Sequence, residues 1–221
     1  VARDHPFVAV QLGPGVQVRQ VGAGAGLGEG ERGEALAARE PGQVMGHEFV
    51  GEVVEVGSDV EGVAIGERVT ASPLVPCNSC PRCREGRHNL CAKVWTQSLA
   101  YGRPGAFAEF LRIPDAVPGH NIFLLGDDMS DDAGALTDPL AVAVHAVKLA
   151  EPVAGATAVA LGLGTIGQQV VQALRARGAG RIIGLDLSTL RLEAAGSLGA
   201  EAVDGSAGVD EALRSVLTED Q

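Results

Sequence analysis

The clearest pattern of apolar and polar positions lies in the last third of the chain. Short apolar runs of the kind that form buried parallel strands occur at Ala158–Leu161, Arg181–Leu185 and 201–203. Apolar residues at helical spacing occur at Ile166, Val170, Val171 and Leu174, and an amphipathic stretch covers Val209–Leu217. Strands that alternate with helices in this way predict a parallel sheet built from βαβ units.

The preceding 150 residues have a different pattern, in which apolar and polar residues alternate with a period of two. This alternation predicts short strands at Phe7–Gln11, Val16–Val21, Phe49–Val56 and Ala106–Ile113. An apolar stripe from Ala133 to Ala150 predicts one helix that leads into the second region. We therefore expect a mixed α/β protein with a β-rich domain at 1–150 and an α/β domain at 151–221.

Composition and charge exclude several classes of protein. The chain has 221 residues, of which 46% are hydrophobic and 20% charged, as in globular proteins. Its net charge of −11 and its 3% aromatic content argue against nucleic acid or an anionic membrane as a partner. No apolar run is long enough for a membrane span, and the N-terminus lacks the features of a signal peptide. We expect a cytoplasmic protein.

All four cysteines lie in one short loop at 77–91, with the spacing C-x2-C-x2-C-x7-C. They are Cys77, Cys80, Cys83 and Cys91. Four thiolates at this spacing can converge on one tetrahedral Zn²⁺, and such a closed site is structural. Two disulfides in so short a loop would be strained and would need an oxidising compartment. A nucleic-acid-binding zinc ribbon, which the arginines of the loop would suit, is disfavoured by the net charge.

The α/β region carries a dinucleotide fingerprint between its first strand and first helix. The loop residues are Gly162, Leu163, Gly164, Thr165, Ile166 and Gly167, which match G-x-G-x-x-G. Asp186 follows Gly167 by 19 residues at the end of the second strand, where a carboxylate accepts hydrogen bonds from the adenosine ribose. The pattern predicts NAD in preference to NADP, and Arg191 softens that preference.

A second match to the same pattern, Gly28–Gly33, serves as a warning about the motif taken alone. Its intervening positions include two glutamates, which would repel a pyrophosphate, and no complete βαβ unit follows it. We interpret it as a flexible loop.

Three features now stand in a recognisable order: Gly46-His47-Glu48 before a strand, then the cysteine loop, then the fingerprint. From about Val44 to Asp204 the chain resembles the zinc-dependent medium-chain alcohol dehydrogenases. The stretch GALTDPLAVAVHAV resembles a helix of the polyol and threonine dehydrogenase branch, in which the acid before proline lies at the catalytic metal. Here that acid is Asp138, although an acid near a helix N-terminus is also favoured by the helix dipole.

The resemblance implies a GroES-like catalytic domain followed by a Rossmann domain, with a catalytic zinc at His47, Glu48 and Asp138. It also implies that zinc acts as a Lewis acid on the alcohol, whose hydride passes to NAD. The substrate would be a small secondary alcohol, a polyol or an L-threonine-like molecule. We expect a homo-oligomer when the protein is full length.

Two departures from the family lead to an alternative hypothesis. The family supplies a further zinc ligand, a cysteine, before Gly-His-Glu, but Val21–Gly33 contains six glycines and no Cys, His or Asp. In addition, only the first half of a Rossmann domain is present, so we expect an N-terminal portion whose exposed sheet edge favours aggregation or partner-assisted folding. The alternative is a non-catalytic relative that keeps only the structural zinc.

Overall fold

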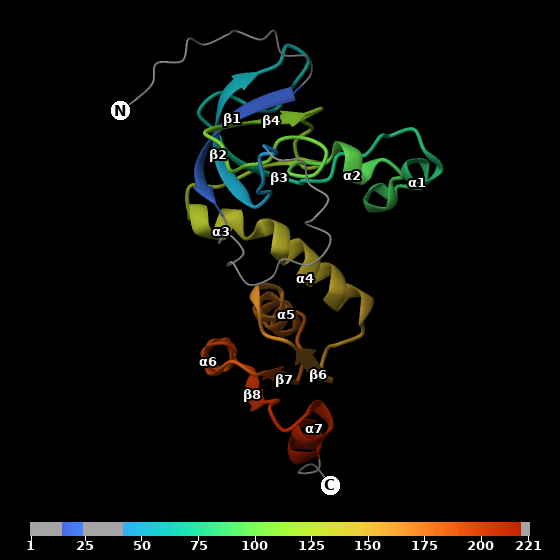
Figure 1. The fold of residues 1–221 in the computed structure, drawn as a ribbon, viewed down its shortest axis with the longest axis vertical. Coiled ribbons are helices and arrows are strands. Elements are labelled where there is room, and N and C mark those ends of the chain that lie inside the picture. The colour runs from blue at the N-terminus through green and yellow to red at the C-terminus, as the bar shows by residue number, and fades with distance from the viewer. Residues whose placement is uncertain (1–14, 24–41, 218–221) are drawn as a thin grey trace. The chain divides into compact units, whose positions relative to one another are not determined.

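The computed structural model describes residues 15–23 and 42–217 (Figure 1). The chain divides into two compact units, Val1–Asp138 and Pro139–Gln221, and the division falls inside helix α4, Thr137–Leu149. The domain boundary at residue 150 stays a prediction. The expected strand at Phe7–Gln11 and the loop at Gly28–Gly33 lie outside the described residues.

The first unit is built on a five-stranded antiparallel sheet with the order β4-β1-β2-β3-β5. Its strands are β1 Gly15–Ala23, β2 Phe49–Val56, β3 Arg68–Ala71, β4 Phe110–Pro114 and β5 Ile122–Leu124. The predictions of strands at Val16–Val21 and Phe49–Val56 are confirmed. The β-rich character follows from the period-two alternation, which gives each strand one apolar face.

Alternate residues of these strands form the core of the first unit. On β1, Val16 pairs with Ile113 and Val18 with Leu111 of β4, and all four side chains are buried. Phe49 and Val53 of β2 belong to the same cluster. Burial of each such side chain contributes about 1.5–3 kcal/mol to folding. This core fixes β2, and His47 and Glu48 come directly before that strand.

The strand predicted at Ala106–Ile113 is shorter than expected, because β4 begins at Phe110. Ala106 and Phe107 instead donate their backbone N–H groups to the carbonyls of Gly46 and Met45, both at 2.8 Å. Ala106 is buried, so an apolar residue at this position does not distinguish a strand from a tightly packed loop. These bonds anchor the segment that carries His47.

The single helix predicted at Ala133–Ala150 is also wrong, because it is two helices, α3 Asp131–Ala135 and α4. Pro139 has no N–H to donate to the carbonyl of Ala135, and its ring excludes a continuous helix at that point. The break places Asp138 in the first turn of α4, where an acid is favoured by the helix dipole.

The cysteine loop forms a lobe that projects from the sheet (Figure 1). The lobe extends a few residues beyond Cys91 and contains the short helices α1 Pro81–Arg84, η2 His88–Leu90 and α2 Val94–Gln97. Cys83, Cys91 and Val94 form a small cluster of their own, with Leu74, Cys77 and Cys80 packed against it.

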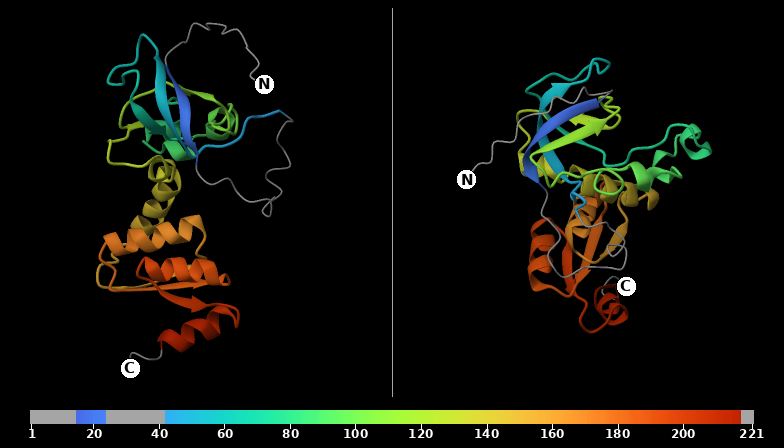
Figure 2. Two further views of the ribbon diagram at one scale, coloured as in Figure 1. Left: turned by 90° about the vertical axis from the view of Figure 1, so that its left-hand side faces the viewer. Right: turned by 45° about the horizontal axis from the view of Figure 1, so that its top comes forward.

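The second unit has a parallel sheet with the order β6-β7-β8. Its elements after α4 are β6 Thr157–Leu161, α5 Thr165–Ala176, β7 Arg181–Asp186, α6 Thr189–Ser197, β8 Glu201–Asp204 and α7 Val209–Leu217. Helices α5 and α6 cover one face of the sheet and α7 the other (Figure 2). Ile182 and Ile183, neighbours on β7, are accordingly buried in different clusters. The predicted βαβ pattern is confirmed.

Helix α5 contains one buried polar side chain that lowers the stability of the second unit. Gln169 is 6% exposed, and neither of its amide atoms has a hydrogen-bond partner among the described residues. We expect Gln169→Met to raise the free energy of unfolding by about 1–2 kcal/mol, because the unpaired amide no longer has to be desolvated. Urea unfolding of the variant measures this change. Gln172→Met, on the exposed side of the same helix, is the control, and a lower midpoint for Gln169→Met alone would contradict the expectation.

Candidate functional site

The four cysteine sulfurs of the lobe lie within 4.8 Å of one another. The sulfur of Cys83 is 4.0 Å from that of Cys77 and 3.5 Å from that of Cys80. Tetrahedral Zn²⁺ with bonds of about 2.3 Å requires sulfurs about 3.8 Å apart, whereas a disulfide requires about 2.05 Å. All four cysteines are free, so the geometry fits zinc and not the alternative of two disulfides.

Hydrogen bonds to the sulfur of Cys77 favour its negatively charged thiolate form, which binds cations. The hydroxyl of Ser79 donates to Cys77 at 3.5 Å, and the backbone N–H of Cys80 donates to the same sulfur at 3.4 Å. Hydrogen bonds, chiefly from Ser79, lower the pKa of Cys77 to about 5. Burial raises the pKa of the Cys83 thiol to about 12, so without metal this cysteine carries a proton at neutral pH.

Zinc binding to the lobe should therefore release a proton. Cys83 has to ionise to become a ligand, whereas Cys77 is already a thiolate at pH 7. We expect zinc affinity to fall by about tenfold or more for each pH unit between pH 8 and pH 6, because protons compete for Cys83. Calorimetric titration in buffers of different ionisation enthalpy measures the protons released. An affinity that does not change over this range would contradict the assignment.

The second group of possible metal ligands is His47, Glu48 and Asp138. One ligand atom from each lies within 4.8 Å of the other two, and all three residues are half-buried. Nε2 of His47 is 3.7 Å from Oδ2 of Asp138, which is too long for a hydrogen bond. Two ligands of one zinc ion lie about 3.4 Å apart, so a cation fits between these atoms with a small adjustment. The structure thus brings together the three residues that the resemblance singled out.

The charges of this cluster also suit a cation. Burial raises the pKa of Asp138, and His47 opposes that shift. Burial likewise raises the pKa of Glu48; His47 lowers it, and the nearby carboxylate of Asp138 raises it. Two partly desolvated acids that repel each other are stabilised in their charged form by a bound divalent ion. Imidazole nitrogen and carboxylate oxygen are both ligands of catalytic zinc sites.

The residue before His47 is a glycine whose conformation and surroundings disfavour any side chain. Gly46 has φ of +88°, and a Cβ added there would lie 2.5 Å from the ring of Phe107.

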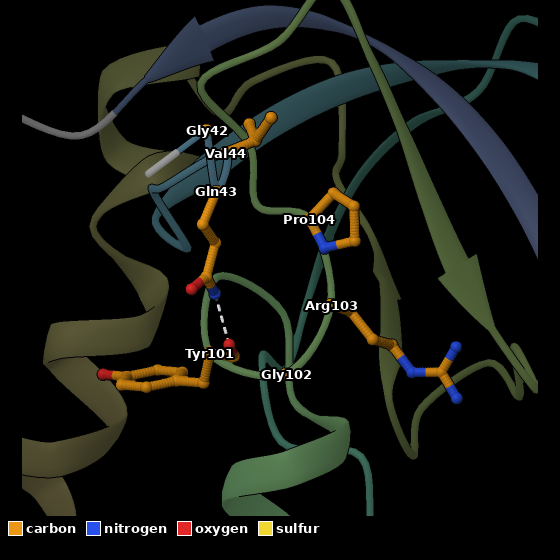
Figure 3. A pocket seen from close by; sticks show the side chains of 7 residues that line it. All are labelled: Gly42, Gln43, Val44, Tyr101, Gly102, Arg103 and Pro104. Atoms are coloured by element: carbon orange, nitrogen blue, oxygen red, sulfur yellow. Dashed lines mark hydrogen bonds between the residues drawn. The ribbon is translucent and has the colours of Figure 1, made fainter. Parts of the chain in front are cut away.

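Close to the segment before His47, the chain forms an open cavity of about 300 Å³ (Figure 3). Its lining residues are Gly42, Gln43, Val44, Tyr101, Gly102, Arg103 and Pro104. The ring of Tyr101 is 5.7 Å from that of His47, a contact that no local sequence pattern marks.

The glycine-rich loop of the second unit matches the fingerprint in detail. Gly162 has φ of +84°, which permits the tight turn after β6. A Cβ on Gly167 would lie 1.9 Å from the carbonyl oxygen of Gly162, so helix α5 approaches the loop too closely for any side chain. A Cβ on Gly164 would meet no atom within 4 Å. Gly164 therefore leaves open space at the N-terminus of α5, where a phosphate can approach.

The carboxylate of Asp186 has a structural role in addition to the contact with the adenosine ribose that its position predicts. Its Oδ2 accepts a hydrogen bond from the backbone N–H of Leu163 at 2.6 Å, and its Oδ1 accepts from Leu187 and Ser188 at 2.8 and 2.9 Å. These bonds, that of Leu163 foremost, lower the pKa of Asp186. The carboxylate thus fixes the turn of the glycine loop, and the sequence motif contains no signal for this role.

The remaining predicted cofactor residues lie around the same loop. Thr165 begins helix α5 and Ile166 follows it, 39% exposed. Nη1 of Arg191 is 3.7 Å from Oδ2 of Asp186, and its side chain is 54% exposed. The guanidinium group of Arg191 is therefore accessible to a ligand that approaches Asp186.

An antiparallel sheet with a four-cysteine lobe, followed by a βαβ unit with a glycine-rich loop, is the arrangement of a medium-chain dehydrogenase. Residues 16–120 match the family described as the alcohol dehydrogenase GroES-like domain. Sorbitol dehydrogenase of Bacillus subtilis is 40% identical over 158 residues, which are 71% of this chain and 43% of that protein. The chain belongs to the zinc-dependent medium-chain alcohol dehydrogenase family.

Further comparisons agree with this assignment. L-Threonine 3-dehydrogenase of Shewanella woodyi is 38% identical over 176 residues, which are 80% of this chain and 49% of that protein. The crystal structure of galactitol-1-phosphate dehydrogenase from Escherichia coli superposes with a TM-score of 0.83 at 31% identity, covering 99% of this chain and 61% of that one. The chain therefore spans about half the length of the curated relatives it matches. Within residues 15–23 and 42–217, no helix has both the length and the apolar character needed to cross a bilayer.

Proposed function

We propose that the whole protein is a zinc-dependent oxidoreductase that transfers a hydride from a secondary alcohol, a polyol or an L-threonine-like substrate to NAD. The observation that carries this proposal is the convergence of the adjacent residues His47 and Glu48 with Asp138, which lies 90 residues after Glu48; the three offer ligand atoms within 4.8 Å of one another. The relatives named above, a sorbitol and a threonine dehydrogenase, support this substrate class.

In this proposal His47, Glu48 and Asp138 hold the catalytic zinc, and the four cysteines hold a structural one. Bound zinc supplies Lewis acidity, which lowers the pKa of an alcohol. With metal bound, the charges of Glu48 and Asp138 are balanced by the ion, which offsets the cost of their partial burial.

For the cofactor, the open space at Gly164 and the free N–H groups of helix α5 suit a pyrophosphate. Asp186 ends β7, the position at which a carboxylate accepts hydrogen bonds from the ribose and repels a 2′-phosphate, which supports NAD over NADP. Arg191, half-exposed beside Asp186, weakens this preference.

A second candidate is a non-catalytic relative that binds only the structural zinc. The absence of Cys, His and Asp from Val21–Gly33 favours it, because the family's third ligand to the catalytic zinc comes from that stretch. The lobe, by contrast, offers all four of its ligands. The two candidates differ in the number of metal ions that the chain holds.

The experiment that tests the proposal uses the chain extended to the length of its relatives. We expect NAD-dependent oxidation of at least one member of a panel of secondary alcohols, polyols and L-threonine, and a lower rate with NADP. Asp138→Asn, which keeps the size of the side chain but removes its charge, should reduce the rate. A protein that binds NADH and oxidises none of the panel would overturn the proposed chemistry.

A further inference from the structure

Tyr101 lies between the cysteine lobe and the His47 cluster and contacts an aromatic ring on each side. Its ring centroid is 5.0 Å from that of Trp95 in helix α2, with the planes at 63°. On the other side it is 5.7 Å from the imidazole of His47, with the planes at 40°. Both distances fall in the range in which aromatic pairs attract each other.

The backbone that carries Tyr101 is held by a buried serine. Tyr101 and Gly102 both donate their N–H groups to the carbonyl of Ser98, at 3.2 and 3.1 Å. Ser98 is fully buried, and its hydroxyl donates to the carbonyl of Val94 at 2.6 Å. The turn formed by residues 98–102 is therefore fixed to helix α2.

Helix α2 is in turn fixed to the fourth cysteine. The backbone N–H of Val94 donates to the carbonyl of Cys91 at 3.1 Å, and Val94 is 2% exposed among the cysteines. The N–H of Lys93 donates to the sulfur of Cys91 at 3.4 Å. A continuous chain of short contacts thus leads from the sulfur of Cys91 to the ring of Tyr101.

The opposite side of the turn is also held. The side-chain amide of Gln43 donates to the carbonyl of Ala100 at 3.1 Å and to that of Tyr101 (Figure 3). A Cβ on Gly102 would lie 2.0 Å from the carbonyl oxygen of Thr96, so the backbone at Gly102 packs against helix α2 too closely for any side chain. The ring of Tyr101 is consequently presented to His47 by a rigid frame.

We propose that Tyr101 is a positioning residue that couples the zinc-loaded lobe to the metal-binding orientation of His47. This inference rests on the proposed function, because it requires that His47 binds a metal. Restricting the imidazole to one orientation lowers the entropy lost when the metal binds. An aromatic contact of this kind corresponds to about a 2- to 10-fold gain in metal affinity at the cluster.

The test is zinc binding by the 221-residue chain, measured by competition with a chelator and counted by native mass spectrometry. We expect Tyr101→Leu to weaken the second zinc ion about 2- to 10-fold and to leave the first, held by the cysteines, unchanged. Tyr101→Phe, which keeps the ring, should restore wild-type affinity. Leu90→Ala, at an exposed apolar position of the lobe, is the matched control.

The outcomes separate this inference from the proposed function. Wild-type affinity of both ions in Tyr101→Leu would overturn the coupling alone, as would equal weakening of both, which indicates a general loss of structure. Failure of Tyr101→Phe to restore affinity would also overturn it, because the ring contact is then not the cause. A wild-type chain that binds a single zinc, at the cysteines, would overturn the proposed function and the coupling with it.

Discussion

Gly167→Ala is expected to destabilise the second unit and to abolish dinucleotide binding. The new methyl group would lie 1.9 Å from the carbonyl oxygen of Gly162, which is a backbone atom, so the backbone itself would have to shift. Overpacking of this kind typically costs about 1–3 kcal/mol. The glycine loop would have to separate from helix α5, which removes the site for the pyrophosphate.

Gly164→Ala is the matched control, because it adds the same methyl group two residues after Gly162. There it meets no atom within 4 Å, and the φ of −66° is ordinary for alanine. We expect wild-type stability and an affinity for NAD lower by tenfold or more, since the methyl group enters the space that a phosphate would occupy. Thermal unfolding and calorimetric titration with NAD measure the two effects.

Two results would contradict this account of the loop. Wild-type stability of Gly167→Ala would show that the approach of helix and loop is not as close as described. Wild-type affinity of Gly164→Ala would show that the dinucleotide does not lie at the N-terminus of α5.

The second large effect is expected for His47→Ala in the chain extended to the length of its relatives. The variant should lose one zinc ion and reduce kcat for alcohol oxidation by about 10³-fold, because Lewis-acid catalysis contributes several kcal/mol to the rate. The fold should survive, since the side chain of His47 is 32% exposed and carries little of the core.

His145→Ala is the control for this variant. His145 lies on helix α4, as Asp138 does, but it is exposed and belongs to neither group of possible metal ligands. Its replacement should leave both zinc content and kcat unchanged. If His145→Ala and His47→Ala behaved alike, the loss would reflect general damage to the protein and not the removal of a ligand.

The features that could be predicted from the sequence are those that depend on neighbouring residues. The spacing of the cysteines predicts their convergence, which the structure places within 4.8 Å, and the alternation of strands and helices after residue 157 predicts the parallel sheet. His47 and Asp138 are 91 residues apart, and they were paired by resemblance to a family and not by any local pattern.

What could not be predicted depends on tertiary packing. The backbone N–H of Leu163 reaches Asp186 across 23 residues of sequence, and Tyr101 reaches His47 across 54. Apolar residues have the same helical period on both sides of Leu136, so this pattern predicts one continuous helix. The break between α3 and α4 could be predicted only from Pro139, which has no N–H to donate. Ala106 is buried like a strand residue but is held by the loop before His47.

The measurement that tests the central claim most directly is the zinc content of the purified chain, compared with that of Asp138→Ala. We expect two zinc ions per wild-type chain and one in the variant, the latter resistant to weak chelators because four thiolates hold it. A single zinc ion in both proteins, lost when Cys83 is replaced by serine, would contradict the claim that His47, Glu48 and Asp138 form a catalytic metal site.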